Sequence, residues 1–342
     1  MEKNKKDDKF DYLDNPEYQK HRKKRLYLLF LLILLTGVML TVSTYAWFTA
    51  NRIVSVNALN VKIDAQGGIE ISVDGLNWKT VVNEDELKAA VDTYESSINQ
   101  LPDSLIPTST IGNVTGGFMD MYKGVTTSNE DGEYILTAKK SDEALGTTGD
   151  YLAFDIFLKV DNASAAYLTP NSTVTFTGTN NAGVENAIRI AFLEEGNVPI
   201  GSSKSAIQSP RGGTNSDLYI WEPNSNTHSP TGITNAYSLF GQTIGANNAP
   251  LSYSGVSREI SESQNITLGN ATAAKYPTYF SNVNANYKTE TGFNTNRQIF
   301  DFKAGITKIR VYIWLEGQDV DCENGSSSGD LEFKFQFTTN PS

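Results

Sequence analysis

The chain has 342 residues, of which 28 are basic and 39 acidic, giving a formal net charge of −11 at pH 7. Its single cysteine, Cys322, excludes a framework of internal disulfides. Residues 1–25 hold nine of the basic and six of the acidic residues, so 19 and 33 remain in the rest of the chain. That acidic excess is unlike a phosphate-binding footprint, and we expect no nucleic-acid partner.

The N-terminus combines a charged head with a long apolar run. Residues 20–25 (KHRKKR) place five permanent cations in six positions, and residues 26–48 contain no Asp, Glu, Lys, Arg or His. At about 1.5 Å per residue, this run is long enough to cross a hydrocarbon core of about 30 Å. Because the cations precede it, we expect residues 1–25 in the cytoplasm and the rest outside. The domains predicted are a cytoplasmic head (1–25), a transmembrane helix or signal peptide (26–48) and an extracellular domain (49–342).

The end of the apolar run carries a candidate cleavage site. Thr44 and Ala46 are small residues at the two positions that a signal peptidase reads, which predicts a cut between Ala46 and Trp47. The run is longer than a typical secretory apolar segment, so a retained anchor is the alternative. The expected partners are therefore the membrane, before or without cleavage, and a signal peptidase.

A hairpin and a short helix are expected early in the extracellular domain. Alternating apolar residues at 69–73 precede Asp74-Gly75, a turn signal, and a second apolar stretch follows at 78–82. Residues 83–94 favour a helix, since Asn83 can cap its start, with Glu86 three positions later. The apolar residues of this helix form one stripe, which predicts that it covers an end of the domain.

The rest of the extracellular chain alternates apolar and polar residues with period two. In residues 151–160, five apolar side chains point one way while Asp155 and Lys159 point the other. Similar strands are expected at 133–138, 172–178, 187–193, 308–316 and 331–338. This pattern is typical of antiparallel sheets with one wet face. We therefore predict an all-β, mainly antiparallel, jelly-roll-like β-sandwich with long inserted loops and one short helix, preceded by the N-terminal hydrophobic helix.

A polar region around 196–300 interrupts these strands. Residues 201–300 contain only eleven charged residues, and Asn, Ser, Thr and Gly abound among them. Aromatic islands at 218–221, 237–240 and 276–280 are unusual for a disordered linker. We expect this region to form ordered loops or short outer strands inserted into the sandwich.

An acidic loop separates the last two predicted strands. Asp319, Asp321, Glu323 and Asp330 occupy relative positions 1, 3, 5 and 12, which resembles the ligand spacing of a calcium loop. The glycine falls at position 7 and the flanking elements are strands, so the loop is no EF-hand. A turn rich in Asp and Gly is the alternative. Calcium is the single candidate cofactor.

Candidate catalytic residues are scarce. The extracellular domain holds one histidine, His228, and one cysteine, Cys322, and it lacks the His-Glu-x-x-His and Gly-x-Ser-x-Gly motifs. A Ser-His-Asp arrangement that recruits His228, or a pair of carboxylates, would make an extracellular hydrolase. The composition favours a protein that is not an enzyme.

The junction at residues 43–51 (STYAWFTAN) resembles the end of signal peptides processed by the SipW-type signal peptidase of Gram-positive bacteria. The substrates of that peptidase include the TasA/camelysin family of biofilm-matrix fibre proteins. The resemblance covers the signal region and the β-rich character after it. It implies a jelly-roll sandwich whose freed N-terminal segment can complete the sheet of a neighbouring subunit.

In this chain the matching segment is residues 53–64, with Leu59, Val61 and Ile63 as its apolar face and a bulge near Ala58. The function expected first is a non-enzymatic, exported structural protein of the cell surface or extracellular matrix, a homo-oligomer or fibre joined through this strand. The alternative is a membrane-anchored extracellular module that binds glycan or protein through residues 201–300.

Overall fold

The computed structural model describes residues 20–21, 23–33, 56–178, 183–238, 240–245, 251–289, 295–322 and 330–341. The chain divides into two units, Met1–Arg52 and Ile53–Ser342. In the first unit, residues 20–21 and 23–33 are helical. None of the helices formed by described residues is long and apolar enough to cross a membrane. Residues 34–48 of the predicted span lie outside the described residues, as does the predicted cleavage site at Ala46 and Trp47.

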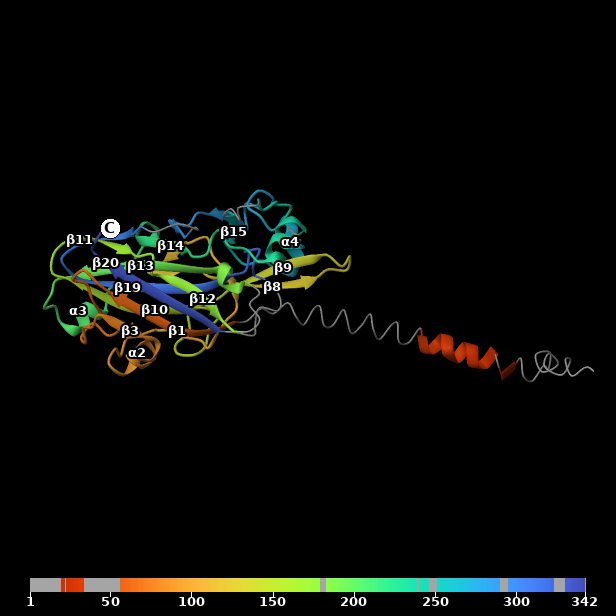
Figure 1. Ribbon diagram of the computed structural model, residues 1–342, viewed down its shortest axis with the longest axis horizontal. Helices are drawn as coiled ribbons and strands as arrows, with labels where there is room; N and C mark the ends of the chain where they lie inside the picture. Colours follow the sequence, from red (N-terminus) through yellow and green to blue (C-terminus); the bar gives the residue numbers. More distant parts are fainter. Residues whose placement is uncertain are drawn as a thin grey trace, which may run out of the picture. The chain divides into compact units, whose positions relative to one another are not determined.

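The second unit is built around two mixed β-sheets (Figure 1). The first, sheet A, has the order β18 (Arg297–Phe302), β11 (Ser164–Leu168), β20 (Asp330–Thr338), β1 (Val56–Ala65) and β3 (Val81–Asn83), with β12 (Thr173–Thr177) on β20 and β4 (Ser104–Leu105) on β1. The second, sheet B, has the order β17 (Tyr287–Lys288), β14 (Leu218–Glu222), β13 (Ile188–Val198), β19 (Gly305–Glu316), β5 (Pro107–Ser109), β8 (Tyr122–Ser128) and β9 (Tyr134–Lys140). β10 (Leu152–Val160) joins sheet B through β19 and also pairs with β2 (Glu70–Ser72).

Two small antiparallel pairs and several short helices complete the unit. The pairs are β6 (Val114–Thr115) with β7 (Phe118–Met119), and β15 (Tyr253–Val256) with β16 (Phe280–Val283). The α-helices are α2 (Glu84–Ala89), α3 (Lys204–Gln208) and α4 (Pro230–Ser238). Short 3-10 turns occur at Ala90–Asp92, Val184–Ala187, Asn215–Asp217, Glu262–Gln264 and Leu268–Asn270. The polar region from 196 to 300 therefore contributes β14 and β17 to sheet B as well as loops.

The inner faces of the two sheets share one apolar core, which makes the fold a sandwich. Phe192 of β13 makes edge-to-face ring contacts with Phe335 and Phe337 of β20, at centroid distances of 5.7 and 5.6 Å. The apolar residues of β10, β19 and β20 that the alternation placed on one side all lie in this core. The all-β, mainly antiparallel prediction is confirmed. The parallel pairs β1–β20, β14–β17 and β5–β19 are the exceptions among the described strands.

The predicted helix forms, and the predicted hairpin is reduced to its turn and one antiparallel bridge between Ile71 and Lys79. Its two arms join different sheets, because β2 pairs with β10 and β3 pairs with β1. The Asp74 carboxylate accepts hydrogen bonds from the backbone N–H groups of Leu76 and Asn77 at 2.8 and 2.9 Å, and Gly75 has a positive φ of 73°. Asn83 caps α2, and Glu86 closes the capping box by accepting from the Asn83 backbone N–H. The helix ends sooner than predicted, at Ala89, and a 3-10 turn follows it. α3 and α4 were not predicted.

β1, the first strand of the second unit, pairs with other strands along both of its edges. β1 pairs in parallel with β20, and its register shifts between Ala58 and Val61, where the sequence predicted a bulge. On its other side it pairs with β3 and β4. β1 is thus an interior strand of sheet A.

Candidate functional site

The outer face of sheet B is covered rather than wet. Asp155, which the alternation placed on a solvent face, has no exposed surface, and neither has Arg310. The prediction of a wet face fails here because β6–β7 and β15–β16 pack a second apolar cluster onto the sheet. The residues of that cluster include Met119, Met121, Tyr151, Tyr253, Val283, Tyr312 and Trp314.

A network of charged side chains centred on Asp155 lies on the same face, where Tyr94, Gln208 and Arg211 contact it. Its carboxylate accepts from Arg310 at 2.7 Å and forms ion pairs with Lys308 at 3.1 Å and Arg211 at 3.3 Å. Burial alone would raise the pKa of Asp155, but Arg310, Lys308 and Arg211 outweigh it and lower the pKa to about 2. Asp155 is therefore ionised at neutral pH and acts as a structural counter-ion.

Lys308 shows how closely the polar groups of this network are packed. Its ammonium group donates to the Tyr94 hydroxyl at 2.7 Å and to the Gln208 carbonyl at 2.9 Å. Burial lowers the pKa of Lys308, while Asp155 opposes that shift. With 1% of its side chain exposed and Asp155 beside it, the amine is fully occupied as a hydrogen-bond donor.

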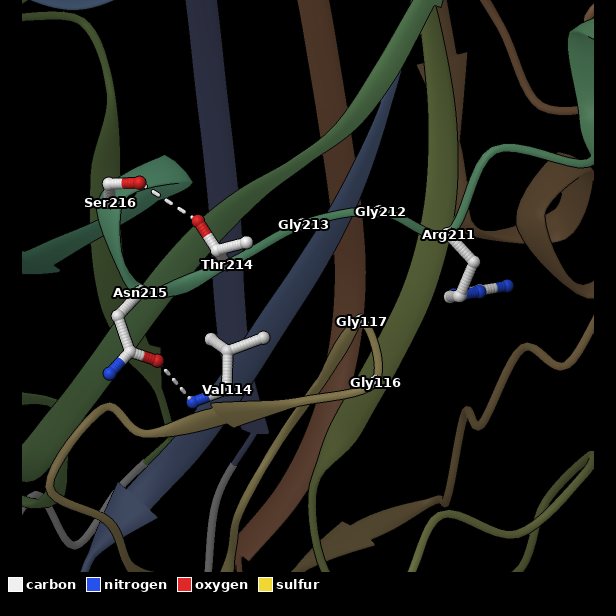
Figure 2. A pocket seen from close by; sticks show the side chains of 9 residues that line it. All are labelled: Val114, Gly116, Gly117, Arg211, Gly212, Gly213, Thr214, Asn215 and Ser216. Carbon is white, nitrogen blue, oxygen red and sulfur yellow. Dashed lines mark hydrogen bonds between the residues drawn. The ribbon is translucent and has the colours of Figure 1, made fainter.

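An open hollow of about 710 Å³ lies beside the network, and its polar lining makes it a candidate for ligand binding (Figure 2). One wall is the Gly116–Gly117 turn between β6 and β7, and the other is the segment 211–216. A Cβ on Gly117 would lie 2.7 Å from Arg211 Cγ, so only glycine permits the two walls to approach so closely. Asn215 fixes the walls together by accepting from the Val114 backbone N–H at 2.7 Å.

Arg211 joins this hollow to a second one of about 640 Å³, which Lys204 and Lys308 also line. Its guanidinium group stacks over Phe118 at 4.9 Å and pairs with Glu195 at 3.3 Å. In Figure 2 the four glycines of the hollow, Gly116, Gly117, Gly212 and Gly213, lie between Arg211 and Asn215. The arrangement offers hydroxyl, amide and guanidinium groups to a polar ligand. The alternative function predicted from the sequence assigns ligand binding to residues 201–300. Segment 211–216 lies in that range, whereas Gly116 and Gly117 lie outside it and were not predicted.

A second buried ionic cluster lies near the acidic loop. Arg189 has 1% of its side chain exposed, pairs with Asp319 and contacts Glu222 at 2.8 Å. Lys288 contacts Glu222 at 3.1 Å. Burial works against the charge of Arg189, but Glu222 and Asp319 raise its pKa above the usual value. The second carboxylate of the loop is also held, because Asp321 accepts from the backbone N–H of Ser229 at 2.8 Å.

The structure places three of the four predicted calcium ligands. Asp319 and Asp321 lie together and hold basic partners, Asp330 begins β20, and Glu323 is outside the described residues. No group of three or more His, Cys, Asp and Glu side chains is arranged to hold a metal within the part of the chain that the structure describes. The calcium site remains a prediction.

His228 contacts a carboxylate that could not be predicted from the sequence. Its Nδ1 lies 2.8 Å from an Asp321 carboxylate oxygen, across 93 residues of chain, and 5% of its side chain is exposed. The hydrolase alternative requires an acid beside His228, and Asp321 occupies that position. A buried His–Asp pair orients an imidazole, but no nucleophile follows from this pair alone.

The predicted strand-exchange residues lie in β1. Val61 and Ile63 are 3% and 0% exposed and belong to the shared core. Leu59 is in the strand, and its side chain is outside the described part.

Searches for similar proteins give no family model, no curated protein and no solved structure that matches the chain.

Proposed function

We propose that the chain is a non-enzymatic, exported structural protein of the cell surface or extracellular matrix, which self-associates through β1. The observation that carries the proposal is the position of β1, which lies between β20 and the β3–β4 side of sheet A. If β1 of one copy leaves, the remaining slot offers main-chain groups on both sides and a core lacking Val61 and Ile63.

The energy of such an exchange is moderate. Burying Leu59, Val61 and Ile63 is worth about 4–8 kcal/mol before ordering costs, whether the strand belongs to the same chain or to a neighbour. Strand exchange therefore replaces contacts within one chain by equivalent contacts between two chains. The equilibrium between monomer and oligomer then depends on protein concentration. Cleavage between Ala46 and Trp47 would free the chain end that has to move.

The test compares assembly of residues 47–342 with and without a competing strand. We expect light scattering and electron microscopy to show oligomers or fibres, and a synthetic peptide of residues 53–65 in excess to suppress them. The matched control is the same peptide with Ile63→Asp, which should not fit the apolar slot. Strictly monomeric behaviour of residues 47–342 at high concentration would contradict the proposal.

Export of the chain is part of this proposal and can be tested separately. The cations at 20–25 and the apolar run at 26–48 favour an N-terminus in the cytoplasm, a body outside, and a signal peptidase as a transient partner. Protease treatment of intact cells should digest the chain beyond Arg52, and mass spectrometry of the native N-terminus should find Trp47 first. Full protection of the region beyond Arg52 would exclude the topology, and an intact Met1 end would leave the membrane-anchored form.

A specific observation favours one second candidate, an extracellular binding module for glycan or protein. Asn215 and the close approach at Gly117 hold the walls of the first hollow together, and this hollow shares Arg211 with the second. Glycan and peptide arrays probed with residues 47–342 should then give a signal that Ser216→Trp, which fills the first hollow, removes. Equal signals from both proteins would count against this candidate.

A further inference from the structure

The helix of the N-terminal unit has a basic surface followed by an apolar surface, and both are suited to bind a membrane. Lys20, Lys23, Lys24 and Arg25 are exposed at the beginning of the described helix. The next eight residues, Leu26 to Ile33, are all apolar, and each is between 59% and 76% exposed. Eight residues make more than two turns, so the apolar surface surrounds the helix.

An apolar surface on every side narrows the choice of partner. A helix that packs on a protein, or lies flat on a membrane, keeps a polar face opposite its apolar stripe. The stretch from 26 to 33 has no such face. A helix that is apolar on every side is suited to insert end-on into the hydrocarbon of a membrane. Insertion of residues 26–33 would place Arg25 and the preceding cations at the level of the lipid headgroups.

The charge pattern of residues 1–25 indicates that the lipid headgroups they meet are anionic. Residues 2–17 carry four lysines and six acids, whereas residues 20–25 carry five Lys and Arg and no acid. The cations are thus concentrated next to the apolar run, while the acids are kept away from it. A membrane surface rich in anionic lipid attracts such a cluster by about 1 kcal/mol for each Lys or Arg near it.

We propose that Lys20, Lys23, Lys24 and Arg25 form a binding site for anionic phospholipid headgroups, which anchors the uncleaved chain at the cytoplasmic surface of the membrane. The proposal rests on the membrane association proposed above and names the lipid that this association selects. It is independent of strand exchange through β1.

The experiment is native mass spectrometry of the uncleaved 342-residue chain in micelles with equal amounts of phosphatidylglycerol and phosphatidylcholine. We expect phosphatidylglycerol to be retained at least about tenfold over phosphatidylcholine, and the preference to fall towards one in a K20Q/K23Q/K24Q/R25Q variant. The matched control is K3Q/K5Q/K6Q/K9Q, which removes the same charge from the distal head and should keep the preference. High salt should weaken it in the native chain.

The outcomes separate the two proposals. Equal retention of both lipids by the native chain, or the same loss of preference in both variants, would overturn the headgroup site while membrane association stands. Failure of the native chain to associate with micelles or vesicles of any composition would overturn both.

Discussion

The outer faces of the two sheets differ although their sequences alternate in the same way. On sheet A, Lys62, Thr173 and Glu332 are exposed to solvent. On sheet B, Asp155, Lys308 and Arg310 occupy equivalent alternate positions and are at most 1% exposed. Alternation therefore identifies the side chains that avoid the shared core, but it does not say what they meet instead. On sheet B they meet one another beneath a second layer.

Removing the central charge of the covered face should give the largest effect. Asp155→Asn keeps the side-chain shape but leaves the buried Lys308 without its ion-pair partner and Arg310 with Glu143 alone. Losing one partner of a buried pair costs about 3–5 kcal/mol. The matched control is Asp301→Asn on β18 of sheet A, where the carboxylate is exposed and the expected loss is below about 0.5 kcal/mol. Urea unfolding of residues 53–342 measures both, and equal losses would show that the two faces do not differ in this way.

Glu316 of β19 should make the covered face sensitive to pH. Burial raises the pKa of Glu316 to about 7, against opposing hydrogen bonds that include one from Trp314 at 3.0 Å. Because the folded state holds this proton more tightly than the unfolded state, stability should fall as pH rises from about 4.5 to about 7, by about 3 kcal/mol at most.

The test is Glu316→Gln, which imitates the protonated form. The variant should match the native protein near pH 5 and exceed its stability near pH 8. The open face supplies the control, since Glu332→Gln should leave the pH profile unchanged. A native profile that is flat between pH 4.5 and 7 would contradict the assignment to Glu316.

The acidic loop connects the two sheets, from β19 to β20, and should bind calcium weakly. Arg189 and His228 already hold Asp319 and Asp321, so calcium would have to compete with both. We expect a Kd of about 1 mM or weaker, worth about 1.4 kcal/mol of stability at 10 mM calcium. Calorimetry should show a heat that disappears in Asp321→Ala, and the absence of heat at millimolar calcium would leave a turn without metal.

Much of the fold could be predicted because each local signal agreed with the tertiary structure. The turn at Asp74-Gly75, the cap at Asn83 and the bulge near Ala58 all depend on neighbouring residues, and they form as expected. The strands β10, β19 and β20 were located by their alternation alone.

The covering of the outer face of sheet B could be predicted from the sequence only in part. The side of β19 opposite the core carries Tyr312 and Trp314 between its charges, whereas the same side of β20 carries Glu332, Lys334 and Gln336 without aromatics. Large aromatics on a supposedly wet face are a sign of a covering layer. The pairs Asp155–Arg211 and His228–Asp321 join residues 56 and 93 positions apart, and no spacing in the sequence specifies such contacts.

The smallest effect is expected from a substitution on the solvent-exposed outer face of sheet A. Thr173 of β12 is exposed and lies opposite Lys334 of β20 in an antiparallel pair. Thr173→Glu creates an opposite-charge pair across the strands, and Thr173→Lys creates a like-charge pair. Both variants lose the β-branched threonine, so their difference isolates the charge, which should favour the Glu variant by about 0.5–1 kcal/mol. Urea unfolding at low salt measures this difference, and 1 M NaCl should abolish it because solvent ions reach an open face. The loss caused by Asp155→Asn should survive the same salt, since that network is buried. A Thr173 difference that persists in 1 M NaCl would mean that the outer face of sheet A is also covered in solution, with a second copy of the chain as the first candidate for the cover.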